Sequence, residues 1–146
     1  MQTVENLILR FLYIGNIPYA PGTICSLFIA VIWYFVPNNL YFQLIIIFLF
    51  ILIGGIMCYR FSLKNGHTDP GYIVIDEAVG MIISLIMIPK TIPCYILALV
   101  LFRFLDIIKP SFIYHSQLLK GGFGIMIDDI LAGIITALII HGFFLW

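Results

Sequence analysis

The strongest constraint on the fold is an apolar run without a charged residue that extends from Leu40 to Tyr59. A helix of this length reaches about 30 Å, the thickness of the hydrocarbon core of a bilayer. The rest of the chain has the same character, because 63% of its 146 residues are hydrophobic and 10% are charged. A soluble domain of this size has too little interior for so much apolar surface. The sequence therefore predicts a membrane protein.

Turn-forming residues divide the remaining chain into further apolar segments and predict an all-α bundle with about five membrane spans. The expected spans run approximately over Thr23–Val36, Leu40–Tyr59, from Asp76-Glu77 to Ile88, Cys94–Ile108 and from Asp128-Asp129 to the C-terminus. Before the first span, apolar residues at helical spacing between Val4 and Leu12 predict a short amphipathic helix at the membrane surface. No linker or low-complexity tract interrupts residues 1–146, which predicts a single domain.

The distribution of cations predicts the orientation in the membrane. Five alternating spans place the starts of spans one, three and five on the same side as the ends of spans two and four. That side holds Arg10, Arg60, Lys64, Arg103, Lys109 and Lys120, while Lys90 alone lies opposite. The excess of positive charge makes the shared side cytoplasmic. The same reasoning places every carboxylate there. The formal net charge is zero, so no basic field indicates nucleic acid as a partner.

Two acid pairs, Asp76-Glu77 and Asp128-Asp129, lie at the edges of apolar runs. Adjacent carboxylates repel each other, and a divalent cation removes the repulsion; oxygen ligands of this kind suit Mg²⁺. The alternative is that these acids only cap helices, since the helix dipole favours an acid at an N-terminus by a few tenths to about 1 kcal/mol. Capping does not explain both pairs together with Asp106, which falls near a helix C-terminus.

The two acid pairs also have similar surroundings. Ile73-Val74-Ile75-Asp76-Glu77 resembles Ile125-Met126-Ile127-Asp128-Asp129, and small residues follow each of them. Small residues let helix backbones approach closely. Two similar helices that run in the same direction would bring both pairs to one site.

Three charged residues at intervals of three, Arg103, Asp106 and Lys109, follow one face of the fourth predicted span. They form either an internal ladder of salt bridges or a phosphate site, in which the cations bind phosphate and Asp106 is a metal ligand or acts on the nucleophile. Weaker candidates for anion binding are the glycine-rich loop at Lys120 and the helix start at Gly22-Thr23. The three cysteines have no metal-binding spacing, which predicts buried thiols.

Four segments together resemble the phosphatidylglycerophosphatase A family of bacterial inner-membrane enzymes. They are Gly15–Thr23, Asp69–Gly80, Phe102–Pro110 and Gly121–Gly133, in family order and spanning nearly the whole chain. The resemblance implies a Mg²⁺-dependent phosphatase that converts phosphatidylglycerophosphate to phosphatidylglycerol and inorganic phosphate in phospholipid biosynthesis. It also implies that the functional residues include Asp76, Glu77, Asp106, Lys109, Asp128 and Asp129. Cys25 and Leu105 depart from the family pattern, which often has glycine and phenylalanine there.

The residues and the resemblance lead to one hypothesis for the site. In it Mg²⁺ is held by Asp76, Glu77, Asp128 and Asp129, and the catalytic residues are Asp106, Asp129 and Glu77. The phosphate is bound by Arg103, Lys109, Lys120, Gly22 and Thr23. Asp106 either ligates the metal, activates water or forms a phosphoenzyme. The substrate phosphate and the acids meet at the cytoplasmic face of the bacterial inner membrane.

Other functions fit the sequence less well. A CDP-alcohol phosphatidyltransferase requires a spaced DGxxAR…GxxxD motif, and a histidine-based lipid phosphatase requires SGH and RxxxxxHxxxD elements; neither is present. A cation transporter or channel subunit would carry acids at mid-depth along a route between both faces. A phosphatase that acts on a different phosphorylated lipid remains an alternative.

Overall fold

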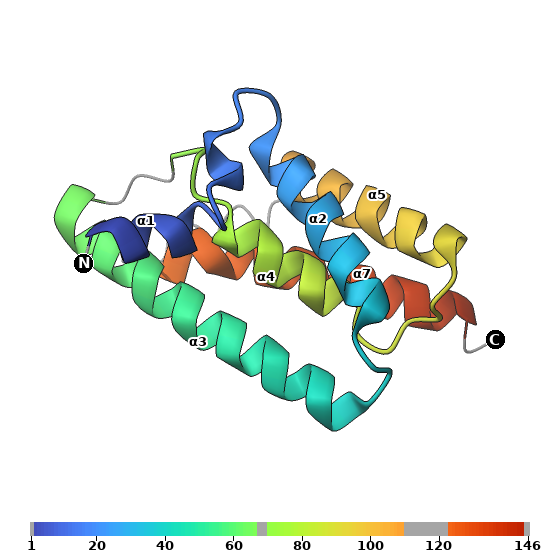
Figure 1. The fold of residues 1–146 in the computed structure, drawn as a ribbon. Helices are drawn as coiled ribbons and strands as arrows, with labels where there is room; N and C mark the ends of the chain where they lie inside the picture. The colour runs from blue at the N-terminus through green and yellow to red at the C-terminus, as the bar shows by residue number, and fades with distance from the viewer. Residues whose placement is uncertain (1, 67–69, 110–122, 145–146) are drawn as a thin grey trace.

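The computed structural model describes residues 2–66, 70–109 and 123–144, and within these ranges it is all-helical, as predicted (Figure 1). The elements are α1 (Gln2–Leu9), the 3-10 helix η1 (Ile14–Asn16), α2 (Pro21–Phe35), α3 (Leu40–Asn65), α4 (Ile75–Ser84), α5 (Ile92–Ile108) and α7 (Phe123–Phe144). The described part of the chain contains no strand.

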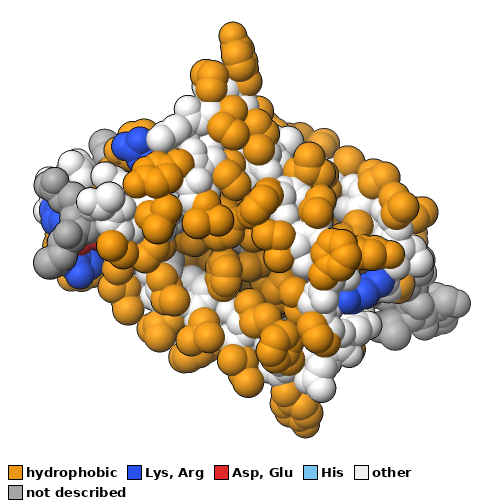
Figure 2. All heavy atoms as spheres, viewed as in Figure 1, with side chains coloured by type: hydrophobic (Ala, Val, Ile, Leu, Met, Phe, Trp, Pro, Cys, Tyr) orange, Lys and Arg blue, Asp and Glu red, His pale blue; other side chains and the backbone are white. Residues whose placement is uncertain are grey.

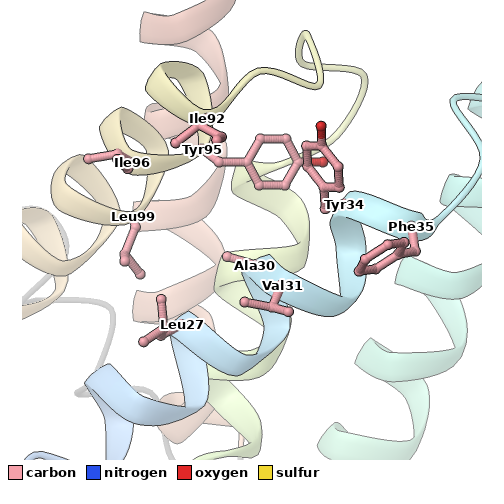
Figure 3. A pocket seen from close by; sticks show the side chains of 9 residues that line it. All are labelled: Leu27, Ala30, Val31, Tyr34, Phe35, Ile92, Tyr95, Ile96 and Leu99. Atoms are coloured by element: carbon pink, nitrogen blue, oxygen red, sulfur yellow. The ribbon is translucent and has the colours of Figure 1, made fainter.

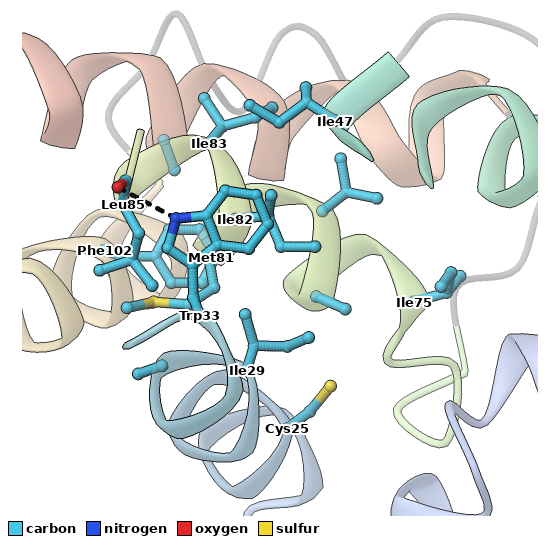
Figure 4. Packing of buried hydrophobic residues seen from close by; sticks show 14 of the residues in the cluster. Cys25, Ile29, Trp33, Ile47, Ile75, Met81, Ile82, Ile83, Leu85 and Phe102 are labelled. Carbon is cyan, nitrogen blue, oxygen red and sulfur yellow. Dashed lines mark hydrogen bonds between the residues drawn. The ribbon is translucent and has the colours of Figure 1, made fainter. Parts of the chain in front are cut away.

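The short helix α4 forms the centre of the bundle. Every residue of α4 except Glu77 is buried, and the helix contacts α2, α3, α5 and α7. Figure 4 shows apolar side chains packed around α4, among them Trp33 of α2, Ile47 of α3 and Phe102 of α5. The indole Nε1 of Trp33 donates a hydrogen bond to the carbonyl of Leu85 at 3.2 Å, which ties α2 to the end of α4. The helix that bears the first acid pair is therefore held from several sides.

Helices α4 and α7 run in the same direction and approach closely through two glycines (Figure 1). A Cβ on Gly80 would lie 2.5 Å from the ring of Phe102 and 2.6 Å from the carbonyl oxygen of Asp129. A Cβ on Gly133 would lie 3.2 Å from Cα of Gly80. Ala78 and Ala132 on the same helices are fully buried. The predicted parallel arrangement of the two acid-bearing helices is therefore present, and small residues make it possible.

Within the described residues, two helices are long and apolar enough to cross a membrane, α3 and the stretch Gly124–Phe143 of α7. Only 17% of the most apolar stretch of α3 is buried, so this helix presents an apolar surface outward, unlike the core helix of a soluble protein. Figure 2 shows hydrophobic side chains over most of the visible face. These are the features of a membrane protein.

The prediction of five spans is not supported. Helices α2, α4 and α5 have 15, 10 and 17 residues. At about 1.5 Å per residue they extend about 22, 15 and 25 Å, short of the roughly 30 Å of a hydrocarbon core. Helix α4 ends at Ser84 because the chain turns at Leu85, and Met87 adopts a positive φ of 53°.

The predicted N-terminal helix is present but shorter than expected. It ends at Leu9, after which Phe11 and Leu12 have positive φ angles of 38° and 56°. Glu5 on α1 faces the end of α3, where it lies 2.7 Å from Lys64 and 3.0 Å from Arg60. The hydrogen bond from Lys64 is the main reason that the pKa of Glu5 lies below its usual value.

The three cysteines are buried thiols, as predicted. The departure from the family pattern at Cys25 is accommodated, because its fully buried thiol donates a hydrogen bond to the carbonyl of Val74 at 3.2 Å. Leu105, the other departure, is half-buried and packs against the core.

Candidate functional site

Four helix segments meet at one end of the bundle. They are the first turn of α2, the first turn of α4, the last turns of α5 and the second turn of α7. Each segment contributes at least one residue that the sequence predicted as functional. The buried position of α4 and the parallel course of α7 bring these segments together.

Three carboxylates form the centre of this region. Asp76, Glu77 and Asp129 each offer an oxygen atom, and these atoms all lie within 4.8 Å of one another. Asp76 and Asp129 are buried, with exposed fractions of 5% and 3%, and Glu77 is half-buried. Because Asp129 comes from α7 and the other two from α4, the cluster depends on the contact between these helices. We call these three residues the acid cluster.

Capping does not account for Asp129. Helix α7 begins at Phe123, five residues before the position expected from the sequence, so its first turn contains no acid. The favourable effect of the helix dipole decays within the first turn. Asp128 and Asp129 lie beyond that turn, where the dipole gives them little support. Asp76 and Glu77, in contrast, do lie in the first turn of α4.

Arg103 on α5 lies beside the acid cluster. Its Nη1 atom is 2.6 Å from Oδ2 of Asp106 and 3.9 Å from Oε1 of Glu77. The charge of Asp106 in turn acts on both Glu77 and Asp129. Arg103 and Asp106 therefore form an ion pair within α5, and this pair also belongs to the site.

Lys109 connects α5 to α7 rather than continuing the ladder along α5. It follows the end of α5 with a positive φ of 44°, and its Nζ atom donates a hydrogen bond to Oδ2 of Asp128 at 2.6 Å. Burial disfavours the charged ammonium, but the hydrogen bond and negative charge of Asp128 outweigh it, so the pKa of Lys109 lies above its usual value. Asp128, predicted as a metal ligand, thus binds Lys109 and does not join the acid cluster.

Gly22 lies against the acid cluster. A Cβ at this position would collide with Oε1 of Glu77 and lie 3.1 Å from Nη1 of Arg103. The sequence predicted Gly22 as a phosphate contact, and the structure shows a steric reason for glycine that the sequence did not reveal. The sequence feature that could have indicated this steric need is the glycine itself, since the first turn of a helix ordinarily tolerates a larger residue. Thr23 follows it and is half-buried.

The chemistry of the cluster fits a divalent cation. Oε2 of Glu77 is buried and has no hydrogen-bond partner among the residues described. A buried, unpartnered carboxylate oxygen is costly, and a bound cation removes the cost. Carboxylate oxygens from three side chains are ligands that Mg²⁺ accepts. Asp76, Glu77 and Asp129 are therefore the residues able to hold a metal here.

One predicted phosphate-binding residue, Lys120, lies outside the described residues, as do Gly121 and Gly122 of the glycine-rich loop. The remaining candidates are all placed at the same end of the bundle. The acid cluster lies next to the pair formed by Arg103 and Asp106, with Gly22 against it, and the pair formed by Lys109 and Asp128 lies on the same two helices, α5 and α7.

Comparison with known proteins identifies the family of the chain. A family model described as phosphatidylglycerophosphatase A matches residues 7–144. The chain is 40% identical over 132 residues to phosphatidylglycerophosphatase A of Escherichia coli (strain K12). This alignment covers 87% of this chain and 76% of the relative. It is also 40% identical over 136 residues to phosphatidylglycerophosphatase A of Haemophilus influenzae, with coverages of 90% and 83%.

A third relative has a different name. The chain is 34% identical over 137 residues to a putative phosphatidylinositol-3-phosphatase of Bacteroides thetaiotaomicron. This alignment covers 86% of this chain and 84% of the relative. No solved structure matches the chain. Since the family model spans most of the chain and the relatives align over nearly all of it, the protein is a phosphatase that belongs to the phosphatidylglycerophosphatase A family.

Proposed function

We propose that this protein hydrolyses phosphatidylglycerophosphate to phosphatidylglycerol and inorganic phosphate, as a step of phospholipid biosynthesis, and that it depends on Mg²⁺. The observation that carries the proposal is the acid cluster beside Arg103, in which side chains from three helices converge at one end of an apolar bundle. The names of the two relatives at 40% identity support the choice of substrate.

In this proposal Asp76, Glu77 and Asp129 hold Mg²⁺. When bound, the ion polarises the phosphoryl group and neutralises negative charge that develops during phosphoryl transfer. Asp128 has a different task, because it fixes the ammonium of Lys109 at the edge of the site.

The cations of the site bind the phosphate group. The guanidinium of Arg103 is held by Asp106, and a guanidinium fixed in this way presents its remaining N–H groups to phosphate oxygens. Lys109, just after the end of α5, supplies a second positive charge. Gly22 and Thr23 at the start of α2 would add backbone N–H groups, since the N-terminus of a helix favours anions.

Asp106 lies near the acid cluster but is not part of it. We assign to Asp106 the role of general base, which accepts the proton of the attacking water. Oxygen of that water bonds to phosphorus, its proton passes to Asp106, the ester bond breaks, and the alcohol oxygen of the lipid takes a proton from solvent. Glu77 and Asp129, as ligands of the ion, keep the reacting groups in place.

We also infer that the chain is a multi-pass protein of the bacterial inner membrane with its site at the cytoplasmic face. Helices α3 and α7 are long enough to cross. Arg60 and Lys64 lie near the end of α3 that contacts α1, while Lys90 donates hydrogen bonds to carbonyls at the opposite end of α2 from Gly22. The excess of cations at the site end fits a cytoplasmic location.

A phosphatase for another phosphorylated lipid is the second candidate, and the name of the Bacteroides thetaiotaomicron relative favours it. The acid cluster and the two cations recognise a phosphate monoester and do not by themselves select the rest of the headgroup. A cation pathway is less well supported, because α2 and α3 carry no acid along their length.

Release of phosphate from defined lipids tests the proposal. The purified full chain is given phosphatidylglycerophosphate, phosphatidylinositol 3-phosphate or phosphatidic acid in mixed micelles, each with Mg²⁺ or with EDTA. We expect the highest kcat/KM on phosphatidylglycerophosphate, loss of activity in EDTA and recovery when Mg²⁺ is returned. A preference for the inositol lipid would establish the second candidate function. Full activity in EDTA would refute the dependence on Mg²⁺.

A further inference from the structure

An apolar groove lies between α2 and α5 on the outside of the bundle. Its volume is about 340 Å³, and Figure 3 shows its walls, with Leu27 and Val31 on α2 opposite Leu99 and Ile96 on α5. The side chains around it are hydrocarbon apart from the hydroxyls of Tyr34 and Tyr95. The groove can therefore accept a hydrocarbon and offers almost nothing to a polar ligand.

One end of the groove adjoins the functional site. Leu27 lies just over one helical turn after Gly22, which contacts Glu77. Leu99 lies one turn before Arg103, which is paired with Asp106 and close to Glu77. The two helices that form the groove are thus the same two that bring Gly22 and Arg103 to the acid cluster, and the groove runs away from that cluster along both of them.

The other end is closed by aromatic rings. The rings of Tyr34 and Tyr95 meet edge to face with their centroids 5.4 Å apart. The hydroxyl of Tyr95 donates to the carbonyl of Trp33 at 3.5 Å, and Lys90 donates to the carbonyl of Tyr34 at 2.8 Å. These contacts fix the rings. From Leu27 to Phe35 the groove follows about 12 Å of helix, at roughly 1.5 Å per residue.

We propose that this groove binds one acyl chain of the phosphorylated lipid substrate, an inference that rests on the proposed function. A lipid with its phosphate at Glu77 and Arg103 must direct its acyl chains along the outside of the bundle, and this groove begins about one helical turn further along α2 and α5. The chain enters between Leu27 and Leu99, and its distal part lies against Tyr34 and Tyr95. Because the tyrosine pair closes the groove, it limits how much of the chain the protein contacts.

A pair of neighbouring substitutions tests this. Val31→Trp fills the groove from an exposed position, whereas Ile32→Trp adds the same indole at the next residue of α2, also exposed but outside the groove. We expect Val31→Trp to lower kcat/KM for the diacyl lipid about fivefold or more, chiefly through KM, since a filled apolar subsite loses its contacts with the ligand. Ile32→Trp should match the wild type.

The same headgroup without acyl chains, glycerophosphoglycerophosphate, separates the possible causes. With this water-soluble substrate, kcat/KM of Val31→Trp should equal that of the wild type. A deficit of equal size on both substrates would mean that the indole disturbs the site, and it would overturn the placement of the chain. Equal turnover of the diacyl lipid by Val31→Trp and wild type would overturn it as well.

Photocross-linking gives a readout that needs binding but no turnover. The probe is a phosphatidylglycerophosphate analogue with a diazirine at the end of one acyl chain, and the control is phosphatidylcholine with the same label. We expect adducts of the probe to concentrate at Tyr34 and Tyr95 and to decrease in Val31→Trp. Adducts spread evenly over α3, or concentrated in the second apolar groove around Phe11 and Phe50, would refute the assignment.

The two experiments also separate this inference from the proposed function. If excess phosphatidylinositol 3-phosphate displaces the probe and phosphatidylglycerophosphate does not, the proposed substrate is wrong but the groove still holds an acyl chain. If phosphatidylglycerophosphate is hydrolysed and the tyrosines are never labelled, the proposed function stands and the groove assignment fails.

Discussion

At the scale of single residues, Glu77 is the side chain on which the other groups of the site converge. It lies against Gly22 of α2, 3.9 Å from Arg103 of α5 and within the acid cluster with Asp129 of α7. Its two oxygens have different surroundings, since one faces Arg103 and the other is buried without a hydrogen bond in the described chain. This arrangement supports the proposal that Glu77 binds a cation.

Replacing Glu77 with Gln removes the charge and keeps the shape. We expect Glu77→Gln to fold and to lose about 100-fold or more in kcat, which is the usual loss when a preorganised charged group is removed from a phosphoryl-transfer site. The matched control is Glu5→Gln, which removes an acid that pairs with Arg60 and Lys64 away from the site. Near-normal turnover by Glu77→Gln would end its assignment to the site.

Gly22 gives a second prediction at this scale. Gly22→Ala places a methyl group where Oε1 of Glu77 lies, so that carboxylate must move. Small displacements of catalytic groups are costly, and we expect kcat to decrease about 10- to 100-fold with little change in unfolding temperature. Gly55→Ala is the control, because among the described atoms its methyl group would meet only Sδ of Met126, at 3.9 Å. Equal activity in both variants would show that Gly22 does not position Glu77.

At the scale of helices, the contact between α4 and α7 assembles the site. Gly80 and Gly133 let the two backbones touch, and this contact brings Asp129 to Asp76 and Glu77. We expect Gly133→Ala to destabilise the protein by about 1–3 kcal/mol, the usual cost of overpacking, and to reduce activity as the helices separate.

Gly142→Ala on the same helix is the control for that variant. No described residue lies within 4 Å of a Cβ at Gly142, so alanine there should leave stability unchanged or raise it by up to about 1 kcal/mol through helix propensity. Thermal unfolding in detergent, followed by circular dichroism, compares the two. If Gly133→Ala is as stable and active as Gly142→Ala, the close approach of α4 and α7 is not required.

The sequence predicted the meeting of the two acid-bearing helices but not the details of the helices themselves. The pattern Ile-x-Ile-Asp followed by acid and small residues was visible twice. The end of α4 at Ser84 was not, because apolar residues continue to Ile88 and the turn at Met87 depends on tertiary contacts such as the hydrogen bond from its backbone N–H to Gln43. The start of α7 was misplaced because the residues before Asp128 are equally apolar.

A similar limit applied to Asp128. Adjacent residues on a helix point in directions about 100° apart, so the two acids of a pair need not reach the same place: Asp76 and Glu77 both join the acid cluster, whereas only Asp129 of the second pair does. Which of the two joins the acid cluster depends on the rotation of α7. The partner of Asp128 is Lys109, whose position follows from the left-handed turn that ends α5. Pro110 in the sequence predicts that the helix ends here, but not that Lys109 adopts a left-handed conformation.

At the scale of the whole molecule, the apolar exterior of α3 predicts how the chain lies in the membrane. Asn38 precedes α3 and Asn65 ends it, both exposed. Since the helix has 26 residues and extends about 39 Å, its ends should lie on opposite sides of the bilayer. A membrane-impermeant maleimide should label Asn38→Cys from outside intact spheroplasts and Asn65→Cys only after lysis.

The native cysteines do not complicate this labelling, because Cys25, Cys58 and Cys94 are buried. The wild-type protein is therefore the background control. Labelling of both introduced cysteines from the same side would show that α3 does not cross the membrane and would remove the basis for placing the site at the cytoplasmic face.

The most direct measurement concerns the ion itself. Mn²⁺ can replace Mg²⁺ among oxygen ligands and is detected by electron paramagnetic resonance, so its binding to the purified full chain can be titrated without substrate. We expect the wild type to bind Mn²⁺, Mg²⁺ to displace it, and Asp76→Asn, Glu77→Gln and Asp129→Asn each to weaken binding about 10-fold or more, while Glu5→Gln binds as the wild type does. Unchanged Mn²⁺ binding in all three site variants would contradict a metal held by the acid cluster.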